Sequence, residues 1–153
     1  MTKADVAAAR FKEGFSCSQA VVSSFSGELG LDSDTANKIS CGFGAGIART
    51  GNTCGAVAGA VMVIGLKYGK AAAGDDAAKE RTYALVQEFI EAFRAKNGSI
   101  NCTELLGYDL RDPGQRTSAH ASQAVAAKCP GFTRDAEHFL IPNLRRHSEN
   151  EKI

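Results

Sequence analysis

The amino-acid sequence predicts an all-α protein. We expect one domain, residues 1–153, with about five to seven helices around a central apolar helix rich in glycine and alanine. A chain of this length is close to the usual size of one domain and can bury about two thirds of its unfolded surface. Apolar residues recur at steps of three and four, and no segment of about four to eight residues alternates as a half-buried strand does.

The first half of the chain predicts a long helix followed by a short one. The long helix should run from about Lys3 to Leu29 and end at Gly30. Asp32 to Asp34 supply capping oxygens for the short helix, which should continue to Cys41. We expect the glycine-rich residues 41–46 to form a tight loop. The shared apolar face of the long helix consists of Phe11, Phe15, Ser18, Val22, Phe25 and Leu29.

The segment from Cys54 to Leu66 predicts the central helix. It is apolar all round, which in a helix of a folded domain means cover on every side. Gly55 and Gly59 stand four apart and should let another helix approach closely. The run also suits a buried strand, but its length and its small residues at helical spacing favour a helix. It is shorter than the roughly 20 residues that span a bilayer.

The second half of the chain predicts four further helices. Asp75 and Asp76 cap a helix that Asn97 and Gly98 end, and its apolar stripe consists of Leu85, Val86, Phe89, Ile90 and Phe93. Cys102 to Leu106 should be helical, with Asn101 and Glu104 spaced as in a capping box. Another helix should cover Gln115 to Lys128 and stop before Pro130, because the residue before proline avoids helical geometry. The last helix, marked by Phe139, Leu140 and Leu144, should be kinked at Pro142.

Composition excludes several classes of function. Eighteen Lys and Arg oppose seventeen Asp and Glu, and tryptophan is absent, so nothing predicts a nucleic-acid partner or attraction to anionic membranes. The first residues do not form a secretory signal, and no membrane span is expected. We therefore expect a cytoplasmic location, where five cysteines are free thiols, metal ligands or redox groups rather than structural disulfides.

The five cysteines form no C-x-x-C pair, so only the fold can bring them together. Taken singly, a helical cysteine is more often a small buried apolar residue than a reactive one. Cys54 and Cys102 each follow residues able to cap a helix. We therefore expect both in first turns, where the helix dipole lowers a thiol pKa. Arg49, shortly before Cys54, should lower it further.

Other candidate sites are weaker. The glycines of residues 42–46 follow no strand and lack the spacing of a phosphate-binding loop. His120 can serve as a fifth ligand or a proton donor to a thiolate, although a surface histidine is the commoner outcome. No pair of carboxylates lies close to a cysteine in the sequence, so acid–base catalysis by paired carboxylates is not indicated.

Four blocks in order along the chain resemble the C_GCAxxG_C_C family. They are Gly14 to Val21, Gly42 to Ala60, Asn101 to Gly107, and Lys128 to Pro130. The resemblance places Cys17, Cys54, Cys102 and Cys129 at the family's four cysteine positions and leaves Cys41 outside the pattern. The central block here reads Cys-Gly-Ala-x-x-Gly, with a glycine between cysteine and alanine, which is a small departure from the family's shorthand.

The resemblance implies a redox-active protein, since the family is described as such from its cysteines. We expect the four thiols to gather and either cycle between dithiol and disulfide, with Cys54 as the attacking thiol, or hold zinc or an iron–sulfur centre. A site without any cofactor is equally compatible. The alternative is a non-catalytic helical binding module with buried structural cysteines. The redox partner stays open, and the small-residue helix fits a protomer able to form a homodimer.

Overall fold

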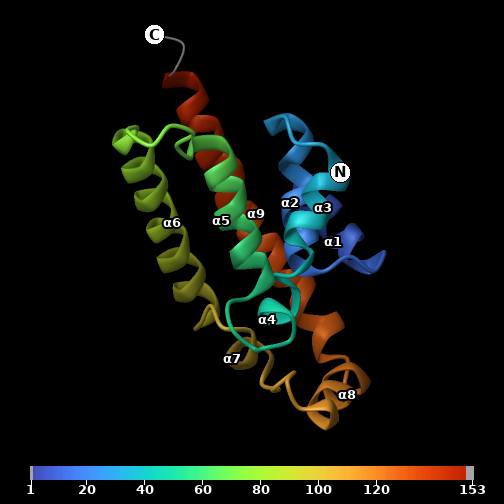
Figure 1. Cartoon of the computed structure of the whole chain (residues 1–153). Coiled ribbons are helices and arrows are strands. Elements are labelled where there is room, and N and C mark those ends of the chain that lie inside the picture. Colours follow the sequence, from blue (N-terminus) through green and yellow to red (C-terminus); the bar gives the residue numbers. More distant parts are fainter. Residues whose placement is uncertain (1, 151–153) are drawn as a thin grey trace.

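The computed structural model describes residues 2–150, with side chains to residue 145, and confirms the all-α fold (Figure 1). No strand is present among these residues, and one isolated bridge joins Thr53 to Asn101. The elements are α1 (Lys3–Lys12), α2 (Cys17–Ser26), the 3-10 helix η1 (Gly27–Leu29), α3 (Ser33–Cys41), α4 (Gly44–Ile47), α5 (Gly55–Tyr68), α6 (Asp76–Asn97), α7 (Cys102–Leu106), α8 (Pro113–Ala121) and α9 (Ala124–Asn150).

The single helix predicted from Lys3 to Leu29 is wrong. The chain breaks after α1, where Gly14 adopts φ +105°, and α2 begins again behind Ser16. Ser16 and Gln19 form a capping box: the Ser16 amide donates to Gln19 Oε1 (3.0 Å) and the Gln19 amide to Ser16 Oγ (3.4 Å). The break therefore makes Cys17 the first residue of a helix instead of an interior one.

The boundaries predicted around Pro130 are also wrong. The break falls earlier, at Ser122 and Gln123, where Gln123 adopts φ +65°. The helix α9 then continues through both Pro130 and Pro142. A proline removes one main-chain hydrogen bond from a helix. Packing of α9 against α1, α2 and α5 outweighs that loss, because its buried face includes Thr133, Ala136, Glu137 and Leu140.

The central helix α5 packs against α2, α6 and α9. Gly55 and Gly59 admit α2 as predicted: a Cβ on Gly55 would lie 3.0 Å from the Ser18 nitrogen, and one on Gly59 3.0 Å from the Ser18 oxygen. The cover is not complete, because Leu66, near the end of α5, is 40% exposed. The expectation of cover on every side therefore fails at this end of the helix.

Two glycines of α5 make a matched test of this helix contact. Gly59→Ala should destabilise the protein by about 1–2 kcal/mol, because the new methyl group meets the α2 main chain. Gly65→Ala should stabilise it by roughly 0.5–1 kcal/mol, because a Cβ there meets nothing within 4 Å and alanine favours the helix. Urea unfolding of both variants measures the difference, and equal effects would contradict the close approach of α2.

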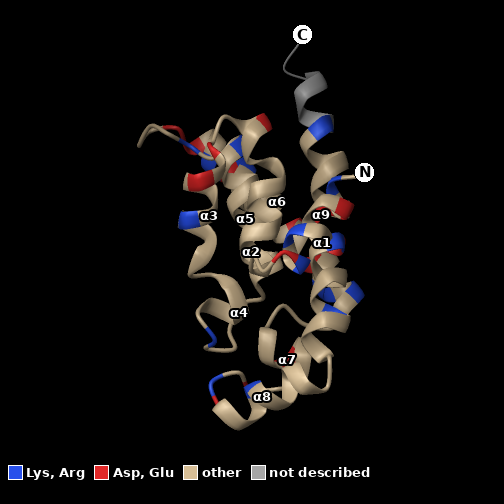
Figure 2. Cartoon of the chain, turned by 90° about the vertical axis from the view of Figure 1, so that its right-hand side faces the viewer, with Lys and Arg blue, Asp and Glu red and all other residues tan. Residues whose placement is uncertain are grey.

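The predicted helices between residues 32 and 106 are otherwise confirmed. Asp32 caps α3 and Asp75 caps α6, each accepting a main-chain hydrogen bond. Gly98 ends α6 in the left-handed conformation. Figure 2 shows charges of both signs intermixed over the molecule, with none on α2. Within the described part of the chain, no helix combines the length and apolarity needed to cross a membrane.

Candidate functional site

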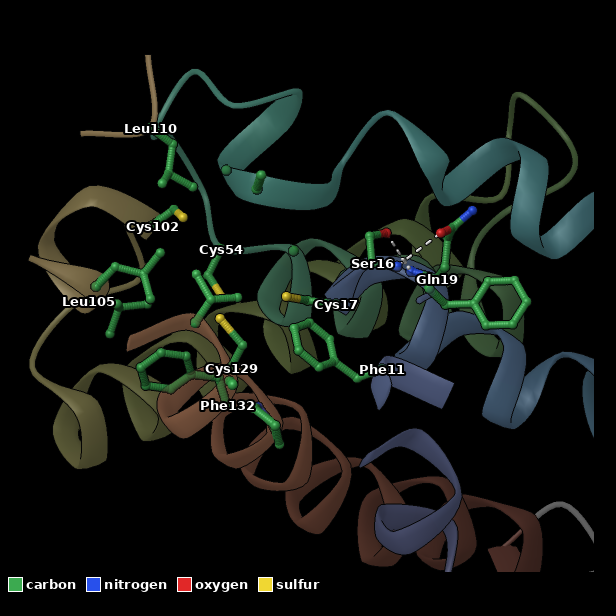
Figure 3. Close-up of a pocket in the computed structure, with 18 of the residues that line it drawn as sticks. Phe11, Ser16, Cys17, Gln19, Cys54, Cys102, Leu105, Leu110, Cys129 and Phe132 are labelled. Atoms are coloured by element: carbon green, nitrogen blue, oxygen red, sulfur yellow. Dashed lines mark hydrogen bonds between the residues drawn. The ribbon is translucent and has the colours of Figure 1, made fainter. Parts of the chain in front are cut away.

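All five cysteines line one cavity of about 650 Å³. It lies at the end of the bundle where α4 and α7 are found (Figure 1). Cys17, Cys54, Cys102 and Cys129 are buried, whereas Cys41 is exposed. In Figure 3 the sulfur atoms of Cys17, Cys54 and Cys129 point into the same space, with Cys102 beside Cys54. The fold therefore brings together four thiols that lie on four separate elements.

The position of Cys17 depends on glycines opposite it. The capping box of Ser16 and Gln19 starts α2, so that Cys17 faces the start of α5. A Cβ on Gly55 would lie 3.1 Å from the Cβ of Cys17, and one on Gly44 would lie 2.5 Å from the Cβ of Ser16. Larger residues at either position would push Cys17 away from the other thiols.

Main-chain hydrogen bonds around the isolated bridge join the loop that carries Cys54 to the loop that leads into Cys102. The Cys54 amide donates to the Ile100 oxygen (2.7 Å), and the Cys102 amide donates to the Asn52 oxygen (2.7 Å). In this antiparallel pairing the two cysteines are diagonal neighbours on one face, a separation of about 7–8 Å between α-carbons. Cys54 and Cys102 are therefore neighbours because two loops pair, which their sequence separation does not reveal.

A left-handed turn, Ala45 to Arg49, forms part of the cavity wall. All five of its residues have positive φ, between 50° and 68°, although only one is glycine. Such geometry costs an L-amino acid roughly 1–2 kcal/mol per residue. Hydrogen bonds hold it, including Asn52 amide to Gly46 oxygen (2.9 Å) and Thr50 Oγ1 to Gly46 oxygen (2.8 Å). Strain of this kind is concentrated at functional sites in proteins.

Gly46 is the one glycine in this turn, and a close neighbour explains why no side chain fits at this position. A Cβ on Gly46 would lie 2.6 Å from the Cβ of Cys102. The loop predicted for residues 41–46 is shorter than expected, because α3 ends at Cys41 and α4 already begins at Gly44. No local sequence signal predicts left-handed geometry for Ala45, Ile47, Ala48 and Arg49.

Cys17 and Cys129 form the most strongly interacting pair of thiols. A hydrogen bond between the two raises the pKa of Cys17 well above its ordinary value, and burial and the charge of a Cys129 thiolate raise it further. Cys129 lies inside α9, in its second turn, and not at a helix end as predicted. The helix dipole therefore does not oppose a thiolate at Cys129 in the way that the sequence boundaries indicated.

The lowered pKa expected for Cys54 is wrong in direction. Cys54 lies at the N-cap of α5, close to the predicted first turn, and the amides of Ala56 and Val57 do favour its thiolate. Burial outweighs them and raises the pKa of Cys54 to about 12, with the charge of Cys17 acting in the same direction. Arg49, which was expected to help, is exposed to solvent.

Cys102 behaves in the same way. It is the first residue of α7, as predicted, but burial raises its pKa to about 12, and thiolates at Cys54 and Cys17 add to the effect. The expected capping box is absent, because Asn101 donates its side-chain amide to Glu104 Oε1 (3.3 Å) and caps no main-chain group. At neutral pH the thiols of Cys17, Cys54 and Cys102 are therefore protonated.

Exposed residues at the rim of the cavity include a histidine, a cysteine and two cations. His120 lines the cavity and is exposed, which agrees with its interpretation as a surface histidine. Cys41 was interpreted as a buried apolar residue outside the family pattern, and that interpretation is wrong, since it is exposed and lines the same cavity as the other thiols. Lys12 and Arg49 also lie at this rim.

The gathering of thiols does not produce a metal-binding geometry. Among the described residues, no three His, Cys, Asp or Glu side chains are placed so as to hold a metal ion. The zinc or iron–sulfur alternative therefore gains no support from this arrangement of Cys17, Cys54, Cys102 and Cys129. The interactions among the same four residues centre on Cys17, which interacts with Cys129, Cys54 and Cys102, while Cys54 also interacts with Cys102.

Comparison with known proteins gives one match. A family model described as "Putative redox-active protein (C_GCAxxG_C_C)" matches residues 15–141 of the chain. Searches of curated proteins and of solved structures found no match. The matched region contains all five cysteines and every element from α2 to α8, together with most of α9.

Proposed function

The chain belongs to the C_GCAxxG_C_C family of putative redox-active proteins, and we propose that it acts by thiol–disulfide exchange, with Cys17 and Cys129 as the redox pair. The observation that carries this proposal is that both buried thiols line the same cavity, where the neighbouring Cys129 is the largest cause of the raised pKa of Cys17. A disulfide between them needs the two sulfurs to approach to a bonding distance of about 2.05 Å, which facing thiols in one cavity can reach by local movement (Figure 3).

The reaction conserves atoms and electrons in two steps. A thiolate of the pair attacks one sulfur of a substrate disulfide, which forms a mixed disulfide and releases the other substrate sulfur as a thiolate that takes up a proton. The second thiol of the pair then attacks the mixed disulfide. The protein ends with a Cys17–Cys129 disulfide and has lost two electrons and two protons, and the substrate has become two thiols.

Three helix starts meet at this site and favour the transient thiolate. Cys17 and Cys102 each begin a helix, and Cys54 caps another. The N-terminal end of a helix carries a partial positive charge. Cys17, Cys54 and Cys102 are buried and their pKa values are raised, so these resting thiols are protonated and the reaction depends on a substrate that enters the cavity. Within the cytoplasm that we expect from the sequence, the resting form is the dithiol.

One observation favours the alternative, a helical binding module with structural cysteines. Burial raises the pKa of Cys17, Cys54 and Cys102, and raised thiol pKa values are typical of inert core cysteines. The two functions differ in one measurable respect. A structural cysteine stays reduced in the folded protein, whereas a redox pair forms a specific disulfide while the protein remains folded.

We expect a Cys17–Cys129 disulfide when the folded, reduced protein is equilibrated with mixtures of oxidised and reduced dithiothreitol. The products are blocked with an alkylating reagent, digested without reduction and identified by mass spectrometry. The Cys17 peptide should appear linked to the Cys129 peptide, and the linked fraction should follow a two-electron Nernst curve.

Cys129→Ser should abolish this two-electron transition, whereas Cys41→Ser should leave it unchanged, because Cys41 is exposed and outside the pair. Circular dichroism at each potential checks that the fold persists. The proposal fails if Cys17 and Cys129 stay reduced until the protein unfolds, or if oxidation links only Cys41 between two chains.

A further inference from the structure

The walls of the thiol cavity separate into an apolar interior and a rim with positive charge. The interior is formed by Phe11, Leu105, Leu110, Val125 and Phe132 together with the buried thiols (Figure 3). A volume of about 650 Å³ is within the range of cavities that bind small molecules. Nothing in this interior offers a charged partner, because the thiols of Cys17, Cys54 and Cys102 are held protonated by their raised pKa values.

The charged residues of the rim all have one sign. Lys12 and Arg49 line the cavity and are exposed, and no Asp or Glu is among the lining residues. In the part of the chain that the structure describes, neither Lys12 nor Arg49 has an ion-pair partner. This local charge is not a property of the whole protein, whose net charge is only +1. The rim therefore attracts an anion, and the interior accepts an apolar group.

We propose that the cavity binds a small-molecule disulfide that has an apolar body and an anionic end. The anionic end lies at Lys12 and Arg49, and the disulfide lies in the interior against Cys17 and Cys129. This inference rests on the proposed function, since it names the substrate class of the same site. For a cyclic disulfide, Cys17 and Cys129 pass two electrons and two protons to the substrate, whose S–S bond opens to a dithiol as the protein disulfide forms.

The arrangement also explains why the thiols do not need to be acidic in the resting protein. A substrate that fills the cavity displaces water and brings its disulfide beside thiols that solution oxidants reach slowly. Cys17 and Cys54 lie at the starts of α2 and α5, where the helix dipole favours a thiolate that forms on either of them. The shape of the cavity and the charge at its rim thus decide which disulfides react, and a low thiol pKa is not needed.

Lipoate is a suitable probe, because it is a cyclic disulfide on an apolar chain that ends in a carboxylate, and lipoamide is its neutral counterpart. Binding is measured by calorimetry to Cys17→Ser/Cys129→Ser, which lacks the redox pair, and to pre-oxidised wild-type protein in case the variant does not fold. Lipoate should bind about five- to tenfold more tightly than lipoamide, and added salt should weaken only lipoate binding.

The preference for lipoate should disappear in Lys12→Ala/Arg49→Ala and persist in Lys38→Ala/Arg94→Ala, which removes two exposed cations that do not line the cavity. Equal binding of the two probes overturns the inference. So does the absence of binding of either probe at about 10 mM, a concentration that detects even weak ligands. A Cys17–Cys129 disulfide that forms with dithiothreitol in that case leaves the proposed function intact. Lipoate binding without any such disulfide supports the cavity's ligand class and refutes the redox pair.

Discussion

Phe89→Ala should lower the free energy of unfolding by about 3–5 kcal/mol, because it removes a fully buried ring and leaves a cavity. Phe89 lies on α6 and contacts the rings of Phe93 (centroids 5.9 Å apart) and Phe139 (5.2 Å). The contact with Phe139 joins α6 to α9, and Phe89 does not line the thiol cavity, so the loss concerns stability and not redox chemistry. Urea or thermal unfolding of the reduced protein measures it.

Tyr83→Ala is the matched control, since Tyr83 is an aromatic residue on the same helix and is 56% exposed. Its removal should change the free energy of unfolding by no more than about 0.5 kcal/mol. If both substitutions have similar effects, the face of α6 that carries Phe89 is not part of the core.

Glu137→Gln should remove a large pH dependence of stability. Glu137 is fully buried on α9, its two carboxyl oxygens have no hydrogen-bond partner among the described residues, and burial raises its pKa to about 8. Lys3 opposes this shift and Asp5 adds to it. The hydroxyl of Ser24, which would also oppose it, donates its proton to the Ala20 oxygen (2.7 Å).

The sign of the effect follows from the raised pKa. The folded protein holds Glu137 protonated up to about pH 8, whereas the unfolded chain loses this proton near the ordinary value of 4.5. The protonated Glu137 carboxyl therefore makes its full contribution to the free energy of unfolding below about pH 4.5. This contribution is lost as the pH rises to about 8. We expect a loss of roughly 2–4 kcal/mol over this range.

Urea unfolding of the wild-type protein and of Glu137→Gln between pH 4.5 and 8.5 checks this expectation. The difference between the two curves isolates Glu137 from the other titrating groups. Glu91→Gln, which changes an exposed glutamate, should follow the wild-type curve. Parallel curves for wild type and Glu137→Gln would show that the Glu137 carboxyl is ionised and solvated at neutral pH.

The sequence was sufficient to predict a helix and its buried face where capping residues mark both ends of the helix. Asp75 at the start and Gly98 at the end fix α6, and its apolar stripe places Phe89 and Phe93 in the core. The close approach of α2 to Gly59 was also predictable, because two glycines four residues apart in an apolar helix have few other uses. The capping box of Ser16 and Gln19 was equally readable, but the apolar periodicity from Phe11 to Leu29 concealed it.

The sequence by itself determined the all-α class and, through the family's motifs, the proposal that four of the five cysteines form the site. Only the tertiary structure decided how they behave. Helix starts predict a low pKa for Cys54, but desolvation depends on what covers the sulfur, and the pKa is raised to about 12. Likewise Pro130 should end a helix, but α9 continues because its buried face packs on other helices, among them α1, α2 and α5. Caps and periodicity act over a few residues, whereas burial and thiol pairing depend on segments up to about 110 residues apart, such as Cys17 and Cys129.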